Sequence, residues 1–345
     1  MRLLDRRARP PNNRGMALRI PRIAGYGKSE IPFDMFDLPR VANEAKRAHK
    51  LANIYHRGQE LAWSGRDVLS ELIDKHGGSI EIEPQKRAAI GRLFAIIMWG
   101  ELAAWRISAQ LADHLVPLEA KMAATSQAHD EARHFYVMYD YLTRLGTIPR
   151  TIDRPSRAVL DLVLRTDSML EKLTGMQLMV ETLALTIFQL VRETEVEPVL
   201  CDLLRYYERD EARHVGLGIQ HLPNMMRAAT GWEAARAFLF QMKIVGWTLR
   251  GLKELEPDFR ALGISPRHVI EIGRNKMFTA TEMLWQGMGS GRPMSREKVE
   301  AAIDALCEVM FPRAEVGSGW LPRLAAARRV WRAGGLQARM VDLAG

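Results

Sequence analysis

Cysteine is scarce in this chain of 345 residues, which contains only Cys201 and Cys307. Two cysteines cannot build a framework of several disulfides, and they cannot supply the set of thiolates that holds a zinc ion or an iron–sulfur cluster. The composition therefore excludes small disulfide-stabilised proteins and thiolate-based metal proteins. The hydrophobic content of 47% and the charged content of 26% are those of an ordinary soluble globular protein.

Long hydrophobic runs are also scarce. The best candidate for a membrane span, residues 237–249, is short and contains Lys243. The N-terminal residues lack the apolar segment of a secretory signal. We therefore expect a cytoplasmic protein without a membrane span.

Acidic residues are nearly absent from the two ends of the chain. Residues 1–25 contain seven Arg and one Asp, and residues 318–345 contain five Arg and one Asp. Together the two ends carry a net charge of +10. Because the whole chain carries +8, the region between them carries about −2. No basic groove for nucleic acid is indicated. We expect a basic N-terminal arm at 1–40 and a basic C-terminal tail at 316–345, either solvated or docked on an acidic partner.

Strand patterns are rare as well, because only residues 79–83 alternate in polarity, and then briefly. Elsewhere the apolar spacing and the positions of Pro and Gly predict helices. The predicted helices cover residues 41–58, 60–76, 84–116, 118–145, a stretch after 156 that ends near 191, 199–221, 231–254, 265–286 and 295–310. The predicted fold class is all-α, with one helical domain at 41–315.

The pentapeptide Asp-Glu-Ala-Arg-His occurs twice, at 130–134 and at 210–214. In each copy the Glu and the His are three residues apart and lie on one face of a helix. A chain with 9 His and 41 acidic residues contains about one such acid-x-x-His pair by chance. Only the two histidines of the pentapeptides have an acid three residues earlier. Two identical copies therefore require a cause.

Two further glutamates lie alone inside strongly apolar helical stretches. Residues 93–105 contain a single ionisable group, Glu101, and residues 176–191 also contain only one, Glu181. A buried carboxylate costs several kcal/mol unless it is paired or bound to a metal. Each of these glutamates therefore needs a partner that its own helix does not provide.

The sequence spacing indicates where those partners lie. Glu101 precedes Glu131 by 30 residues, and a predicted turn falls midway between them. Glu181 precedes Glu211 by the same interval, again with a turn midway. Two arms of about 15 residues, or roughly 22 Å at 1.5 Å per residue, then fold back and place the lone Glu opposite the Glu-x-x-His pair. Two such half-sites, joined by a longer crossover, close into a four-helix bundle with six inward ligands.

The six predicted ligands have the chemistry of a di-metal site. They are Glu101, Glu131, His134, Glu181, Glu211 and His214. Four carboxylates cancel the charge of two divalent cations, and carboxylate oxygens with one imidazole per ion favour iron or manganese over zinc or copper. We predict two iron ions, with a manganese–iron pair as an alternative.

The remaining residues of the pentapeptides have supporting roles in this hypothesis. Asp130 and Asp210 can accept the second N–H of an imidazole and so fix its tautomer. Arg133 and Arg213 can compensate the charges of these aspartates. The alternative is that the pentapeptides form solvated salt bridges on helix surfaces.

Residues 84–222, about 40% of the chain, resemble the ferritin-like di-iron carboxylate superfamily through Glu101, the two pentapeptides and Glu181. This superfamily includes the small subunit of class I ribonucleotide reductase, bacterial multicomponent monooxygenase hydroxylases, acyl-carrier-protein desaturases and arylamine N-oxygenases. The stretch 209–222 is similar to the corresponding reductase helix, whereas the Glu at position 101 resembles the monooxygenases. The resemblance implies a ferritin-like four-helix bundle with additional N- and C-terminal helices.

Two positions depart from the pattern of that superfamily. One turn after the first ligand His, where the reductase has its radical tyrosine, this chain has Met138. A stable tyrosyl radical of that kind is therefore not expected. One turn after the third carboxylate, where the hydroxylases often have Thr, this chain has Leu185 between Thr182 and Thr186.

Five large side chains share the predicted inward faces of the bundle helices and are candidates for a substrate pocket. They are Met98, Trp105, Leu185, Phe188 and Tyr207. Side chains of this kind either line a cavity beside the metal ions or fill the core.

The resemblance implies a non-haem di-iron oxidoreductase that uses dioxygen to hydroxylate, N-oxygenate or desaturate a small organic substrate. Electrons are expected from a separate reductase or ferredoxin, because no flavin, nicotinamide or cysteine-cluster motif is found in the sequence. A homodimer is also expected. Two alternatives stay open. One is a redox protein without its own substrate, such as a radical-generating subunit or a ferroxidase; the other is a metal-free helical interaction protein that uses its basic ends.

Overall fold

The described part of the chain is helical and contains no strand, as the predicted all-α class requires. The computed structural model describes residues 43, 48–149, 151–288, 296–313, 315–317 and 319–334. The chain divides into two compact units, Met1–Asp37 and Leu38–Gly345, and the described residues belong to the second. The predicted basic arm at 1–40 therefore lies outside the described residues.

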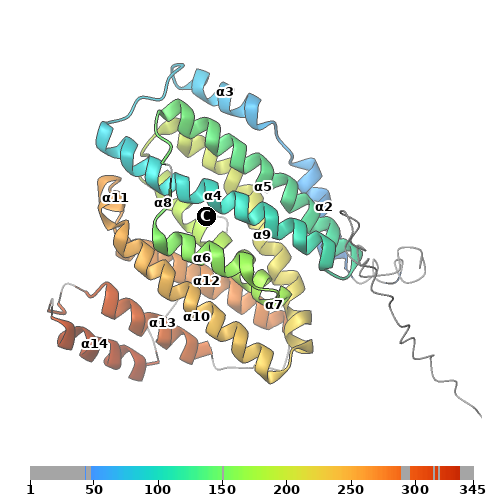
Figure 1. Cartoon of the computed structure of the whole chain (residues 1–345), viewed down its shortest axis with the longest axis vertical. Helices are drawn as coiled ribbons and strands as arrows, with labels where there is room; N and C mark the ends of the chain where they lie inside the picture. Colours follow the sequence, from blue (N-terminus) through green and yellow to red (C-terminus); the bar gives the residue numbers. More distant parts are fainter. Residues whose placement is uncertain are drawn as a thin grey trace, which may run out of the picture. The chain divides into compact units, whose positions relative to one another are not determined.

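Four long helical segments form the central bundle (Figure 1). They are α4 (Pro84–His114), α5 (Leu118–Leu145), α8 (Glu181–Glu193) with the preceding π-helical segment η1 (Thr174–Val180), and α9 (Pro198–Ala228). Pro84 and Pro198 occupy the first turns of α4 and α9, where a missing N–H is tolerated. Gly146 ends α5 with a φ of 78°, a left-handed conformation that suits glycine. α4 packs along α5, α8 packs along α9, and α5 contacts α9.

Further helices surround this bundle and cover its sides. They are α2 (His49–Glu60), α3 (Gly65–Lys75), α6 (Arg154–Arg165), α7 (Met169–Leu173), α10 (Gly231–Glu254), α11 (Glu256–Ala261), α12 (Pro266–Met288), α13 (Arg296–Met310) and α14 (Trp320–Arg332). α2 and α3 pack on α5 and α9, whereas α6 and α11 pack on α4. α10 packs on α6 and η1, and α12 packs on α8 and α9. The bundle is thus enclosed from several directions.

Several helices differ from the sequence prediction. α11 lies between two predicted helices, and α3 begins five residues after its predicted start at 60. α9 runs through Pro223 to Ala228, past its predicted end at 221. An internal proline removes one backbone hydrogen bond, and here the packed helix continues beyond it. α14 lies within the segment predicted as a basic tail, where Ala326 and Ala327 are buried and the helix packs against α13.

Two helical stretches are long and apolar enough to cross a membrane by length and composition, contrary to our expectation from the sequence. They are Pro84–His114 and Met169–Glu193. Within their most apolar windows, however, 61% and 78% of the residues are buried inside the fold. This burial is consistent with core helices of a soluble protein, and their apolar character follows from their place in the bundle. A cytoplasmic location stays a prediction.

Candidate metal centre

The six predicted ligands lie together in the centre of the bundle, and none is more than 4% exposed. Their potential ligand atoms form two groups, each with all atoms within 4.8 Å of one another. The groups are Glu101, Glu131, His134 and Glu211, and Glu131, Glu181, Glu211 and His214. Because Glu131 and Glu211 belong to both groups, they can bridge two ions. Glu101 and Glu181 would then be terminal carboxylates, one for each ion.

The two histidines turn one nitrogen inward and the other outward. Nδ1 of His134 lies 3.1 Å from Oε1 of Glu211, and Nδ1 of His214 lies 2.7 Å from Oε2 of the same carboxylate. Nε2 of His134 lies 3.2 Å from Oδ2 of Asp210, and Nε2 of His214 lies 3.4 Å from Oδ2 of Asp130. Each ring can therefore offer Nδ1 to an ion while its Nε2–H donates to an aspartate, which fixes the tautomer.

Each aspartate serves the histidine of the other pentapeptide, and the two arginines close the arrangement. Arg133 contacts Asp130 at 2.5 Å and Asp210 at 2.8 Å. Arg213 contacts the same two aspartates at 2.8 and 2.9 Å. These four side chains form a ring of ion pairs between α5 and α9, which we call the Asp–Arg ring. Because the ring joins α5 to α9, it fixes the His134 half-site relative to the His214 half-site.

Burial and mutual repulsion control protonation of the cluster. Burial raises the pKa of Glu101 and Glu181 well above the usual range, and the nearby Glu211 carboxylate raises both further. Burial alone would lower the pKa of His134 and His214, but the surrounding carboxylates raise both well above the ordinary histidine value. In the metal-free protein these groups therefore retain protons that a metal ion must displace.

Metal uptake should consequently weaken as the pH falls. A raised pKa means that a proton is held more tightly at neutral pH, so acid favours the proton over the ion. Each displaced proton changes the affinity by about tenfold per pH unit. Calorimetric titration with manganese(II) or iron(II) between about pH 6 and pH 8, in two buffers of different ionisation enthalpy, would count the released protons. An affinity that does not change over this interval would contradict the expectation.

Two glutamines next to the cluster were not among the predicted site residues. Gln127 donates through Nε2 to Glu131 at 2.9 Å and to Glu181 at 3.0 Å. Gln177, on η1, donates to Oε1 of Gln127 at 3.1 Å. Each glutamine precedes a ligand glutamate by four residues, so helical spacing could have found both. π-Helical turns such as η1 are frequent at functional sites.

Two aromatic residues outside the predicted ligand set contact His134 and Asp210. Trp63, between α2 and α3, donates Nε1–H to Oδ2 of Asp210 at 2.7 Å, and its ring lies 4.8 Å from the guanidinium carbon of Arg133. Tyr207 donates its hydroxyl to the backbone oxygen of His134 at 2.6 Å and stacks on that ring at 4.2 Å. No local pattern identifies Trp63, because 147 residues separate it from Asp210.

An apolar cavity reaches the cluster from the side of α4 and α8. We call it the inner cavity, and its volume is about 100 Å³. Its wall includes Glu101 and Glu181, Gly100 and Ala104 from α4, Ala184 and Ile187 from α8, and residues of α6, α10 and α11. Gly100, Ala104 and Ala184 are the small residues that lie next in sequence or within one turn of the two terminal carboxylates.

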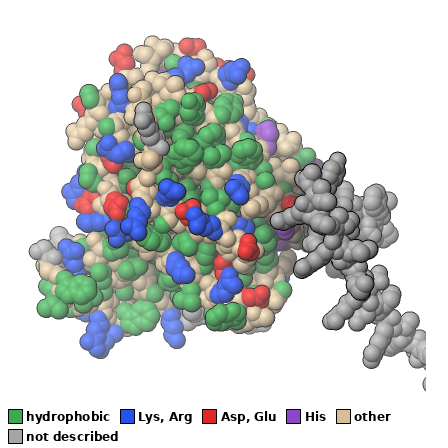
Figure 2. All heavy atoms as spheres, viewed as in Figure 1, with side chains coloured by type: hydrophobic (Ala, Val, Ile, Leu, Met, Phe, Trp, Pro, Cys, Tyr) green, Lys and Arg blue, Asp and Glu red, His purple; other side chains and the backbone are tan. Residues whose placement is uncertain are grey.

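The predicted pocket residues do not line this cavity. Met98, Leu185, Phe188 and Tyr207 are at most 2% exposed and fill the core. Trp105, predicted to face inward, is 45% exposed. Ala104 and Ile107 occupy the interior at this turn, so the indole lies at the surface. Figure 2 shows other hydrophobic side chains gathered on the viewed face of the molecule. Whether a large side chain fills the core or lines a cavity depends on how several helices pack together, which the spacing along one helix does not encode.

Neither a protein-family model nor a curated protein sequence matches the chain. Among solved structures, the fold is similar to that of "Protein 19 with aldehyde deformylating oxidase activity from Synechococcus". The TM-score is 0.51 and the sequence identity is 20%, over 59% of this chain and 92% of the other. The chain therefore has the ferritin-like helical fold. Its buried carboxylate–histidine cluster offers two groups of possible metal ligands.

Proposed function

We propose that this protein is a di-iron oxidase that uses dioxygen to oxidise a small organic substrate held in the inner cavity. The observation that supports this function is the contact between the cavity and the cluster. Glu101 and Glu181, one terminal carboxylate of each predicted ion site, form part of a wall that is otherwise mainly apolar. An apolar pocket with a few polar groups at one place is typical of small-molecule sites.

Each part of the site has a role in this proposal. Two bound iron ions would supply the redox chemistry that reduces dioxygen. Glu131 and Glu211 would bridge them, while the Asp–Arg ring holds both imidazoles with Nδ1 inward. The apolar wall would exclude water and orient the substrate. Insertion of one oxygen atom consumes two electrons and two protons and releases water, so a separate reductase or ferredoxin belongs to the proposal.

The reaction is proposed only as a class, namely hydroxylation, N-oxygenation, desaturation or a related oxidation. The similar protein from Synechococcus is described as having aldehyde deformylating oxidase activity, which is a further oxidation of this general kind. The second candidate is a redox protein without its own substrate. The cavity argues against a ferroxidase, and the buried Met138 argues against a radical subunit that needs tyrosine at that position. The homodimer stays a prediction, which sedimentation analysis can test.

Substrate-triggered oxygen consumption is the direct test. The iron-loaded, chemically reduced protein is mixed with dioxygen and with candidate molecules, among them aromatic amines, acyl thioesters, terpenoids and aliphatic compounds. We expect one class to accelerate oxygen consumption by about tenfold or more and to be recovered oxidised. Oxygen consumption that no organic molecule changes, together with turnover of added iron(II), would favour the ferroxidase.

Replacing Gly100 by phenylalanine should suppress the triggered reaction. A Cβ at Gly100 meets no heavy atom within 4 Å, so the new side chain can enter the inner cavity without disturbing α4. We expect a loss of about tenfold or more in kcat/KM with unchanged iron content. Gly246→Phe is the matched control, because Gly246 is also helical and uncrowded but does not line the inner cavity. Equal activity of both variants would contradict the proposed location of the substrate.

A further inference from the structure

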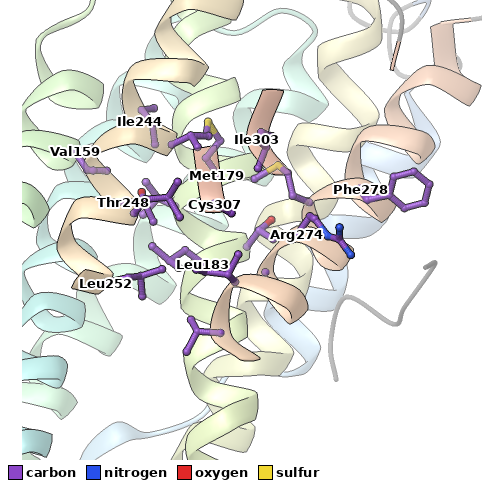
Figure 3. Close-up of a pocket in the computed structure, with 18 of the residues that line it drawn as sticks. Val159, Met179, Leu183, Ile244, Thr248, Leu252, Arg274, Phe278, Ile303 and Cys307 are labelled. Carbon is purple, nitrogen blue, oxygen red and sulfur yellow. The ribbon is translucent and has the colours of Figure 1, made fainter. Parts of the chain in front are cut away.

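A second apolar cavity adjoins the inner cavity on a side that contains none of the predicted ligands. We call it the outer cavity. It has a volume of about 150 Å³ and lies among α6, η1, α8, α10, α12 and α13 (Figure 3). Five residues line both cavities: Val159, Val180, Leu183, Thr248 and Leu252. The two cavities therefore meet along one wall, and side-chain rotation there would join them.

The wall around this junction is almost entirely hydrocarbon. Thr248 is the one polar residue among the five that are shared. The charged residues of the outer cavity, Arg274 and Glu300, belong to α12 and α13, which contribute nothing to the inner cavity. Arg274 donates to Asp304 at 3.0 Å, and Figure 3 shows its guanidinium pointing away from Thr248. Burial raises the pKa of Cys307 to about 12, so this thiol in the wall is neutral.

The two cavities follow one another from α4 to α13, and this arrangement suits a particular molecular shape. A compact ring system fits into one of them but cannot occupy both through a junction of Val, Leu and Thr side chains. A flexible unbranched chain can thread the junction and bury its methylene groups on both sides. An ionised group at the junction would lose its hydration without gaining a partner, because none of the five shared residues is charged.

We propose that the two cavities together bind an unbranched, uncharged aliphatic chain, with one end beside Glu101 and Glu181 and the other near α13. This assignment of a substrate class rests on the proposed function for the reaction at the inner end. Binding of the chain itself requires only the apolar wall, so it can be measured without turnover.

The test measures binding of primary n-alcohols of increasing length to the full-length, metal-loaded protein without reductant. The affinity should rise by about fourfold for each added methylene group until both cavities are filled, and then level off. Cyclic alcohols with the same number of carbon atoms should bind more weakly than the longer linear ones. Alcohols whose affinity does not depend on length or shape would overturn the proposal.

Two variants locate the chain within the protein. Thr248→Phe narrows the junction, and Gly273→Leu fills only the outer cavity, since Gly273 lines that cavity alone and its Cβ would have ordinary contacts with Thr186 at 3.5 Å. In both variants the affinity should level off at a shorter chain length than in the parent protein. The affinity of Gly273→Leu for the shortest alcohols should stay within about twofold of the parent value. Gly246→Phe should leave the whole series unchanged. An unaltered limiting length in a folded Gly273→Leu protein would overturn the assignment.

The outcomes separate this inference from the proposed function. Length-dependent binding by a protein that takes up no iron would reject the di-iron oxidase and keep the aliphatic site. Oxygen consumption that is triggered by other molecules, without length-dependent binding of linear alcohols, would keep the oxidase and reject the aliphatic site.

Discussion

Replacing Glu131 by alanine should abolish the binding of both metal ions, whereas replacing Glu101 by alanine should leave about one ion per chain. Glu131 belongs to both groups of ligand atoms, and Glu101 belongs to only one. Loss of a bridging carboxylate removes a ligand and a negative charge from each ion at once. Iron content after anaerobic loading and desalting should fall from about two per chain to nearly none for Glu131→Ala and to about one for Glu101→Ala.

The matched control for this experiment is Glu119→Ala. Glu119 lies on the same helix as Glu131 and is only 5% exposed, but it belongs to neither group of ligand atoms. It should retain about two ions. Circular dichroism would confirm that the metal-free variants are folded, which we expect because removing one of several clustered carboxylates relieves repulsion. The same loss of iron in Glu131→Ala and Glu101→Ala would contradict the bridging role.

Replacing Asp210 by alanine should lower the free energy of unfolding of the metal-free protein by about 3–5 kcal/mol. Asp210 is completely buried, and its carboxylate contacts the side chains of Trp63, Arg133, His134 and Arg213. Removing it leaves the buried Arg133 and the partly buried Arg213 with one aspartate between them, and a cation that loses its partner in such surroundings is costly. Denaturant unfolding of the metal-free protein separates this effect from the stabilisation that bound metal provides.

Two controls distinguish the buried Asp–Arg ring from a general effect of charge. Glu60 pairs with Arg57 at 2.9 Å, but these side chains are 58% and 65% exposed, so Glu60→Ala should cost at most about 1 kcal/mol. Asp210→Asn keeps the shape of the side chain and loses only its charge. The decrease in the free energy of unfolding should therefore lie between those of Glu60→Ala and Asp210→Ala. If Asp210→Ala lowers the free energy of unfolding no more than Glu60→Ala does, the Asp–Arg ring does not stabilise the fold.

Much of the bundle could be predicted from local pattern. Helical periodicity is a property of neighbouring residues, and prolines and glycines mark helix ends through their own backbone preferences. The boundaries of α5 and α10 agree with their predicted ranges of 118–145 and 231–254. The equal intervals of 30 residues predicted which ligands would meet, because α-helices have a constant rise and the two turns are short.

The sequence by itself thus determined the all-α class, the paired half-sites and the six residues that come together between them. Tertiary structure decided which aspartate reaches which histidine, because that choice depends on how α5 and α9 cross. It also brought Trp63 to Asp210 across 147 residues. It placed Trp105 at the surface and left the inner cavity beside Gly100 and Ala104. A cavity is the volume that several helices fail to fill together, so no single helix encodes it.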